Sequence, residues 1–174
     1  HTGATIENAF SGRSNTWIAD AIYKWAPGGN ATQTNLKLQA EYFRRNERGA
    51  LSYDSGGQSA GAVASAYDAV QSGWYAQGIY QFIPQWRFGL RYDKLYSGTP
   101  RIAAIDDGVL SITDFARLLA YNPSRSTAMV DYSPSEFSRF RVQWARDSAR
   151  PGVVDNQLFI QYIMSLGVHG AHAF

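Results

Sequence analysis

Residues 158–174 have the sequence LFIQYIMSLGVHGAHAF and carry the clearest structural pattern in the chain. Apolar side chains occupy the even positions from Leu158 to Val168, while Gln161, Ser165 and His169 occupy odd positions. Successive side chains of a β-strand point to opposite faces, so this alternation predicts a strand with one apolar face. The segment is longer than the roughly 9–11 residues with which a tilted strand crosses a membrane.

Six further segments alternate with the same period of two residues. One of them sets apolar even residues such as Leu38 against polar odd residues such as Lys37. With the final segment they predict an all-β, antiparallel chain of seven strands. The six segments are 17–25, 35–42, 74–82, 86–93, 125–132 and 139–144.

The predicted connections alternate in length. Short turns are expected at 27–33, 83–85 and 133–136, and a moderate loop at 147–155. Long loops are expected at 47–71, which is rich in Gly, Ser and Ala, and at 96–122, where ITDFARLLAY (112–121) predicts a short helix. Outer-membrane barrels have short periplasmic turns and longer outer loops. The pattern therefore predicts an up-and-down transmembrane β-barrel in the bacterial outer membrane of a Gram-negative cell.

Composition fits this prediction and excludes other classes. The chain has 174 residues, of which 45% are hydrophobic and 17% charged. This length and hydrophobic content are sufficient for a single domain over residues 1–174. There is no cysteine, and a net charge of +2 does not suggest a partner nucleic acid. The sequence contains no run of about 18 apolar residues, so it predicts no membrane-spanning helix. A mean hydropathy of −0.31 is compatible with a barrel, whose strands are apolar only at alternate positions.

Charged residues in mid-strand are expected to face a polar lumen, because a small soluble core would reject them. Basic residues outnumber acidic ones, which predicts a mild preference for anions. The alternative is a lattice of paired charges that stiffens the wall without selectivity. The lumen-facing set is Asp20, Lys24, Lys37, Glu41, Arg87, Arg91, Asp93, Arg125, Asp131, Arg139 and Arg141.

Aromatic residues mark the ends of several predicted strands, as membrane-interface girdles do. The predicted girdle residues are Trp17, Trp25, Trp74, Phe82, Trp86, Tyr92 and Trp144. If the short turns are periplasmic, the last strand runs inward. A terminal Phe174 that closes an amphipathic strand containing Tyr162 resembles the signal by which outer-membrane proteins reach their assembly machinery.

Catalysis and metal binding find little support. The histidines are His1, His169 and His172, and the chain holds no GxSxG, Walker or HExxH motif. His169 and His172 lie three apart and would point to opposite faces of a strand, so they are expected to be interface residues. The acidic pair Asp106–Asp107 is expected to be solvated. We therefore predict no enzyme, no cofactor and no metal site.

The number of predicted strands indicates whether this chain would form a whole barrel. Single-chain bacterial barrels have even strand numbers, and seven strands are predicted. The chain is therefore expected to be the C-terminal portion of a longer barrel, paired with a missing N-terminal part. A closed eight-stranded barrel, with its eighth strand within residues 1–12, is the alternative.

Several motifs resemble a group of proteobacterial outer-membrane proteins labelled porin-like or zinc-regulated TonB-dependent receptors. They include NAFSGR (8–13), GLRYD (89–93), SPSEFSR (133–139) and the ending QYIMSLGVHGAHAF. The resemblance implies an outer-membrane channel or transport protein in contact with lipid. The alternatives are a structural or docking barrel whose loops bind partner proteins, and a soluble β-barrel that binds an apolar ligand.

Overall fold

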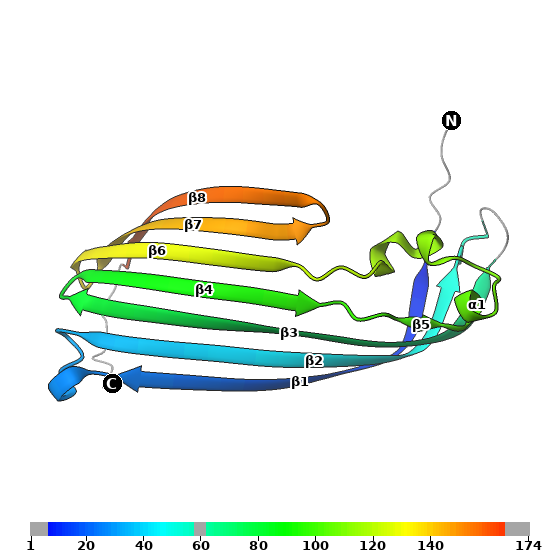
Figure 1. The fold of residues 1–174 in the computed structure, drawn as a ribbon, viewed down its shortest axis with the longest axis horizontal. Helices are drawn as coiled ribbons and strands as arrows, with labels where there is room; N and C mark the ends of the chain where they lie inside the picture. Colours follow the sequence, from blue (N-terminus) through cyan, green and yellow to red (C-terminus); the bar gives the residue numbers. More distant parts are fainter. Residues whose placement is uncertain (1–6, 58–61, 166–174) are drawn as a thin grey trace. The chain divides into compact units, whose positions relative to one another are not determined.

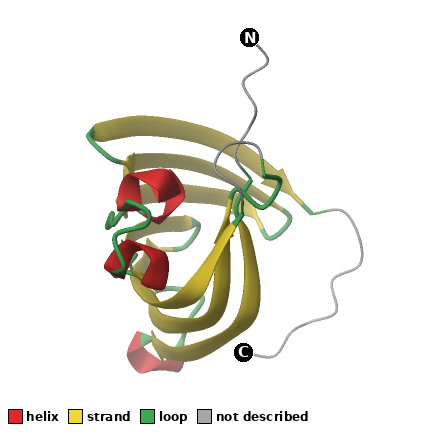
Figure 2. Ribbon diagram, turned by 90° about the vertical axis from the view of Figure 1, so that its right-hand side faces the viewer, coloured by secondary structure: helices red, strands yellow, loops and turns green. Residues whose placement is uncertain are grey.

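The computed structural model describes residues 7–57 and 62–165, and strands make up most of this part of the chain (Figures 1 and 2). Helical turns are η1 (Pro27–Gly29), α1 (Ala103–Asp106) and η2 (Ile112–Leu118). The strands are β1 (Ala9–Trp25), β2 (Asn35–Tyr53), β3 (Val63–Ile83), β4 (Trp86–Tyr96), β5 (Arg101–Ile102), β6 (Ser124–Ser135), β7 (Ser138–Arg150) and β8 (Val153–Met164).

The strands form one sheet whose order follows the chain. Its order is β1-β2-β3-β4-β6-β7-β8, and the two-residue β5 pairs with β3. All-β architecture with antiparallel, up-and-down pairing is therefore confirmed, and each of the seven predicted strands coincides with a long strand. Within the described residues β1 and β8 end the path without pairing to each other, so the sheet is not closed. The strand that was not among the seven predicted ones is the two-residue β5, whereas the eight-stranded alternative expected an additional strand within residues 1–12.

Two predicted loops are wrong. Strand β2 continues to Tyr53 and β3 begins at Val63, so much of the predicted loop 47–71 is strand. The small residues of this stretch allow strands to approach closely: a Cβ on Gly12 would lie 2.7 Å from the Gly49 Cα atom. The predicted loop 147–155 is a tight hairpin, in which Gly152 takes the left-handed φ of 71°. The predicted turn at 83–85 is present between β3 and β4.

Contacts divide the chain into two compact units. Unit 1 comprises His1–Ala19, Tyr42–Trp74 and Leu95–Asn122, and unit 2 comprises Asp20–Glu41, Tyr75–Lys94 and Pro123–Phe174. Strands β1 to β4 contribute residues to both units. The two units differ in which side chains they bury.

Unit 1 has an apolar core. Tyr53 packs edge-on against Phe115, with ring centroids 5.7 Å apart. Burial raises the pKa of the Tyr67 phenol above its ordinary value, and the Glu47 carboxylate raises it further while Arg45 opposes them. The phenol therefore stays neutral in this core. Its buried members are Leu51, Tyr53, Tyr67, Ala69, Ile102, Ala104 and Phe115.

The connection between β4 and β6 supplies part of that core. The predicted helix at 112–121 is present as η2, which ends at Leu118 and is kinked at Phe115. Ser111 caps it: the Thr113 backbone N–H donates to the Ser111 hydroxyl, and the Ser111 N–H donates to the Asp114 carboxylate. No helix of the described residues is long and apolar enough to cross a membrane.

Replacement of the Phe115 ring tests whether η2 is held by the core of unit 1. We expect Phe115→Ala to lower the free energy of unfolding by about 3–5 kcal/mol, the usual cost of deleting a buried ring. Hydrogen exchange of the 101–118 amides should also speed up. Val109→Ala, at a side chain that is 62% exposed, is the control, and equal effects of both changes would contradict the assignment.

Candidate functional site

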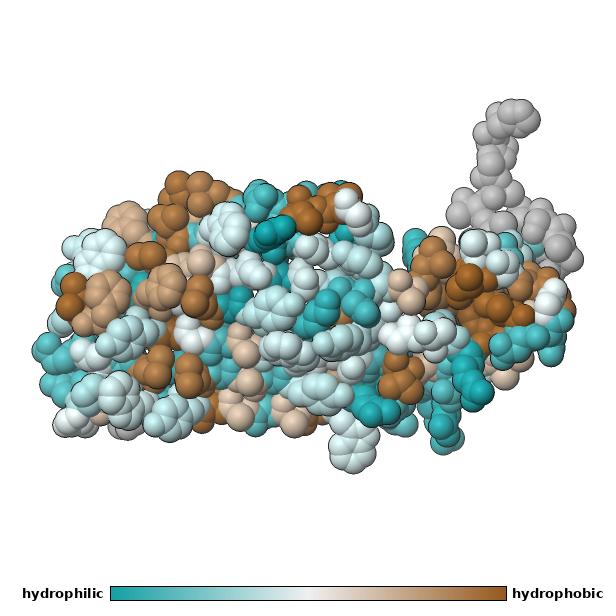
Figure 3. All heavy atoms as spheres, viewed as in Figure 1, coloured by the Kyte–Doolittle hydropathy of each residue, from teal (hydrophilic) through white to brown (hydrophobic). Residues whose placement is uncertain are grey.

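Strand register sorts the side chains of unit 2 into rows that run across β4, β6, β7 and β8. In two adjacent rows the side chains are almost all large and apolar: Phe88, Val130, Val142 and Ile160, and then Leu90, Ala128, Trp144 and Leu158. These rows lie on what we call the exposed face, where Val142 is 49% exposed and Trp144 is 44% exposed. Figure 3 shows brown apolar side chains over the region of β7 and β8.

A row of aromatic residues borders the apolar rows at the end of the sheet where β3–β4 and β6–β7 turn. Register places Trp86, Tyr132, Phe140 and Tyr162 side by side on the exposed face. The Trp86 and Tyr132 rings lie 4.8 Å apart, as do the Phe140 and Tyr162 rings. Such pairs of neighbours in a sheet add to its stability. The sequence reasoning missed Tyr132 and Phe140 as members of this row.

The opposite face of unit 2, which we call the shielded face, is polar. Along β4, for example, Arg87 and Arg91 are half-buried whereas Phe88 and Leu90 are exposed. Nine of the eleven predicted lumen residues lie on this face, while Asp20 and Lys24 lie on β1, where every residue is exposed. The nine are Lys37, Glu41, Arg87, Arg91, Asp93, Arg125, Asp131, Arg139 and Arg141.

Asp131 is the most enclosed charge of the shielded face, with 1% of the residue exposed. Arg87 on β4 and Arg141 on β7 lie directly opposite it in register. Arg141 donates two hydrogen bonds to the Asp131 carboxylate, of 2.7 Å from Nε and 2.8 Å from Nη2. Arg139 Nη1 lies 3.8 Å from Asp131 Oδ2. One carboxylate therefore lies among three guanidiniums, and both of its oxygens accept hydrogen bonds from Arg141.

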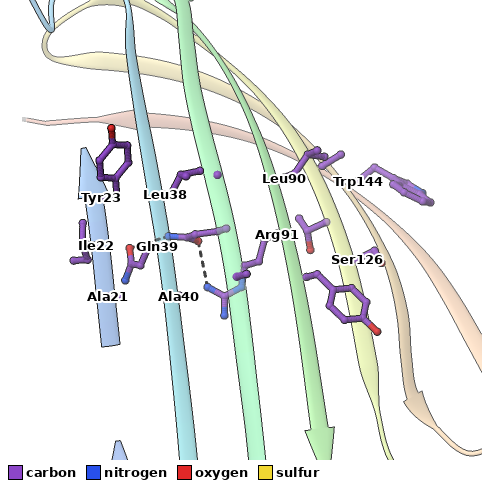
Figure 4. A pocket seen from close by; sticks show the side chains of 16 residues that line it. Ala21, Ile22, Tyr23, Leu38, Gln39, Ala40, Leu90, Arg91, Ser126 and Trp144 are labelled. Carbon is purple, nitrogen blue, oxygen red and sulfur yellow. Dashed lines mark hydrogen bonds between the residues drawn. The ribbon is translucent and has the colours of Figure 1, made fainter. Parts of the chain in front are cut away.

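A second network crosses the sheet further from the turns. Arg91 pairs with Asp93 through contacts of 2.6–3.0 Å, and its guanidinium carbon lies 3.9 Å from the centre of the Tyr75 ring. Gln77 donates to Gln39 and accepts from Arg91. Figure 4 shows Gln39 and Arg91 on one side of the sheet with Trp144 turned away from them. Tyr75, Gln39 and Gln77 are missing from the predicted lumen-facing set.

Ion pairs link several of the predicted residues. Arg125 lies 3.6 Å from Asp147, a residue missing from the predicted set, and donates to Gln157 at 3.2 Å. The paired-charge lattice considered from the sequence is thus present in part. Arg87 is different, because no hydrogen bond or ion pair engages it among the described residues, and its buried Nε lacks a partner.

The chemical character of the buried side chains changes along β2, although odd-numbered residues face the buried side in both units. In its unit 2 part Leu38 and Tyr42 are 44% and 45% exposed, while Lys37 and Glu41 are half-buried. In its unit 1 part Leu51 and Tyr53 are buried on the odd-numbered face, and Arg48 is exposed on the even-numbered one.

The buried side chains of β3 change from apolar to polar in the same way. In its unit 1 part Tyr67 and Ala69 are buried, at 6% and 3% exposure. In its unit 2 part Tyr80 and Phe82 are 40% and 42% exposed, and the intervening Gln81 is buried. The buried side of these strands is therefore largely apolar in unit 1, where Glu47 is the buried charge of β2, and polar in unit 2.

The predicted girdle residues lie at exposed or half-buried positions, but not in one row. Trp86 belongs to the aromatic row, Tyr92 lies three rows further along, and Trp144 shares a row with Leu90 and Leu158. Trp17, Trp25 and Phe82 are exposed, and Trp74 is half-buried.

Several predictions concern residues at the chain ends. Phe174, His1, His169 and His172 lie outside the described residues. Among the described residues there is no group of three or more His, Cys, Asp or Glu side chains that would hold a metal ion. Asp106 and Asp107 are both exposed, as expected for a solvated pair.

Comparisons with known proteins leave the family open. No family model matches the chain, and no solved structure matches it. An uncharacterised protein of Aquifex aeolicus (strain VF5) is 25% identical over 173 residues, which cover 96% of this chain and 32% of that protein. The chain thus spans about a third of the length of this relative. The resemblance to proteobacterial porin-like proteins stays a prediction.

Loss of the Asp131 carboxylate tests its part in the shielded face. We expect Asp131→Ala to lower the free energy of unfolding by about 3–5 kcal/mol, because it leaves enclosed guanidiniums without a counter-ion. Asp155→Ala is the control: its pair with Arg150 is exposed, at 43% and 67% of the side chains, and should contribute less than about 1 kcal/mol. Denaturant titration measures both, and a loss no greater for Asp131→Ala would refute the assignment.

Proposed function

We propose that the chain is part of a bacterial outer-membrane β-barrel that acts as a porin-like channel, with the shielded face of unit 2 lining a polar, mildly basic lumen. The observation that carries this proposal is the sidedness of unit 2. Its exposed face is apolar and its shielded face is charged, whereas in unit 1 the buried side of β2 and β3 is largely apolar. A sheet in water buries its apolar face. Strands β2 and β3 provide an internal comparison, since each has both arrangements.

Lipid contact accounts for the exposed face. Apolar surface left in water costs about 25 cal/mol per Å², and contiguous apolar patches of this kind mark membrane or protein interfaces. The rows around Val142 and Trp144, bordered by the aromatic row, match the apolar band and girdle of a membrane barrel. The same distribution argues against a soluble barrel with an apolar ligand, because the enclosed side of unit 2 is the polar one.

A water-filled conduit accounts for the shielded face. It carries ions and amides in mid-strand, and a hollow of about 1020 Å³ bordered by Lys37, Arg87 and Arg139 lies at its turn end. Most of its acidic side chains are paired with arginine, which leaves basic residues in excess. That excess supports a preference for anions.

The open edges of the sheet support a larger barrel. Exposed edge strands invite pairing with another strand, and β1 and β8 both lie at edges within the described residues. The chain spans about a third of its Aquifex relative. We therefore propose further strands of the same barrel as the partner of these edges. The assembly machinery remains the proposed partner of the C-terminal strand, with Tyr162 and Phe174.

A docking role is a second candidate. It is favoured by the apolar core of unit 1, which holds η2 and the connection between β4 and β6 in place. Such an ordered connection suits recognition of a partner protein by a barrel that does not conduct.

Cysteine accessibility tests the two faces directly, because the chain has no natural cysteine. We expect Gln143→Cys, on the shielded face, to react with a charged thiol reagent when the full-length protein is in liposomes. Val142→Cys, its neighbour on the exposed face, should not react until the protein is unfolded in urea. Arg48→Cys in unit 1 is the water-exposed control. Equal labelling at 142 and 143 in liposomes would refute lipid contact.

Planar bilayers test conduction by the purified full-length protein. We expect single-channel steps and a reversal potential, under a salt gradient, that shows preference for chloride over potassium. Absence of conductance would refute the channel and favour the docking role. Preference for potassium would refute the basic lumen while leaving the barrel in place.

A further inference from the structure

The turn end of the shielded face combines an excess of positive charge with unused hydrogen-bond donors. The hollow of about 1020 Å³ lies here and is bordered by four basic side chains, Lys24, Lys37, Arg87 and Arg139. Glu136, an exposed turn residue, is the acidic side chain among the residues that line it. The lining thus has a formal charge of +3.

Asp131 does not compensate this charge. Both of its carboxylate oxygens accept from Arg141, at 2.7 Å and 2.8 Å. Arg139 reaches it at 3.8 Å, too far for a hydrogen bond, and Arg87 lies opposite it in register without an ion pair. Enclosed charges are normally paired. Two guanidiniums therefore lack a full counter-ion of their own.

Unpartnered donors gather at the same place. Among the described residues three buried side-chain atoms have no hydrogen-bond partner: Arg87 Nε, Arg139 Nε and the Ser133 hydroxyl. All three residues line this hollow. Buried polar groups without partners are rare in folded proteins, and a missing ligand or ion is one explanation for them. Here all three lie beside uncompensated positive charge, which favours an anion that accepts hydrogen bonds over water alone.

We propose that Arg87, Arg139 and Ser133 form a binding site for a tetrahedral oxyanion of the phosphate type, carried by a soluble ligand. Guanidinium groups match phosphate through paired N–H donors, and Lys37 adds charge from β2. The site retains phosphate-bearing solutes at the turn end of the shielded face. It rests on the proposed function in one respect, that this face meets water.

Isothermal titration with inorganic phosphate tests the site in the purified full-length protein, in a maltoside detergent that has no charge or phosphorus. We expect saturable binding that Arg87→Gln weakens roughly tenfold, the loss expected for one charge-assisted hydrogen bond. Arg91→Gln is the matched control, because it removes the same charge from a guanidinium already paired with Asp93. It should change the affinity less than about twofold, since a more distant charge is largely screened by salt.

The Arg87→Gln variant should fold normally, because Arg87 makes no ion pair within residues 7–57 and 62–165 whose loss would destabilise the protein. Arg87→Lys, which keeps the charge but loses the paired donors, gives a second measurement and should bind phosphate more weakly than the natural protein. Absence of saturable binding, or an equal loss in Arg91→Gln, would overturn the site. So would acetate that binds as tightly as phosphate, because it would remove the preference for a tetrahedral anion.

Two further results separate the possible outcomes. Phosphatidylglycerol added to the micelles should not displace phosphate, because the site lies on the face opposite the apolar rows; displacement would assign the site to a lipid headgroup and overturn the soluble ligand. The titration does not depend on conduction. A protein that binds phosphate but does not conduct keeps the site and loses the channel, whereas one that conducts without binding phosphate loses the site alone.

Discussion

The opposite orientation of neighbouring side chains along a strand is the constraint on which the rest of unit 2 depends. Arg87, Arg91 and Arg141 need partners and water, and their neighbours Phe88, Leu90 and Val142 must then point the other way. Antiparallel register extends this choice from one strand to the next, so that whole rows share a face. A slip of one residue would exchange the two faces. The two faces of the sheet in unit 2 are therefore suited to two different media.

The same constraint gives the shielded face an uneven charge along the strands. One row joins Asp93, Arg125, Asp147 and Asp155, and is acidic. Three rows nearer the turns, Arg87 and Arg141 flank Asp131, with Arg139 beside them, and the local charge is basic. Charges more than about 8 Å apart are largely screened at physiological salt. A dissolved ion would therefore meet two distinct regions, whose local charges a net charge of +2 for the chain does not reveal.

Unit 1 shows what the same strands do with a different distribution of residues. Beyond Tyr42 on β2 the buried side carries Leu51 and Tyr53, and η2 brings Phe115 against them. A small apolar core forms, and Arg48 on the other side pairs with Asp68 at 2.8 Å. In unit 1 the strands thus have an apolar core of their own. This core includes residues of the connection between β4 and β6 and so gives that connection a defined structure.

Local patterns in the sequence determined the seven long strands, the turn at Pro84–Gln85 and the grouping of charged residues on one face, because each depends on a period of two or on a turn residue. The extension of β2 and β3 was missed, since the close approach of Gly12 and Gly49 is a contact between strands. The tertiary structure alone decided which charges are paired. Parity put Arg87, Asp131, Arg139 and Arg141 on one face, but only strand register sets Arg87 and Arg141 on either side of Asp131 and lets Arg141 take both carboxylate oxygens. Register is a relation between distant segments, and it decides which of these cations is left without a partner.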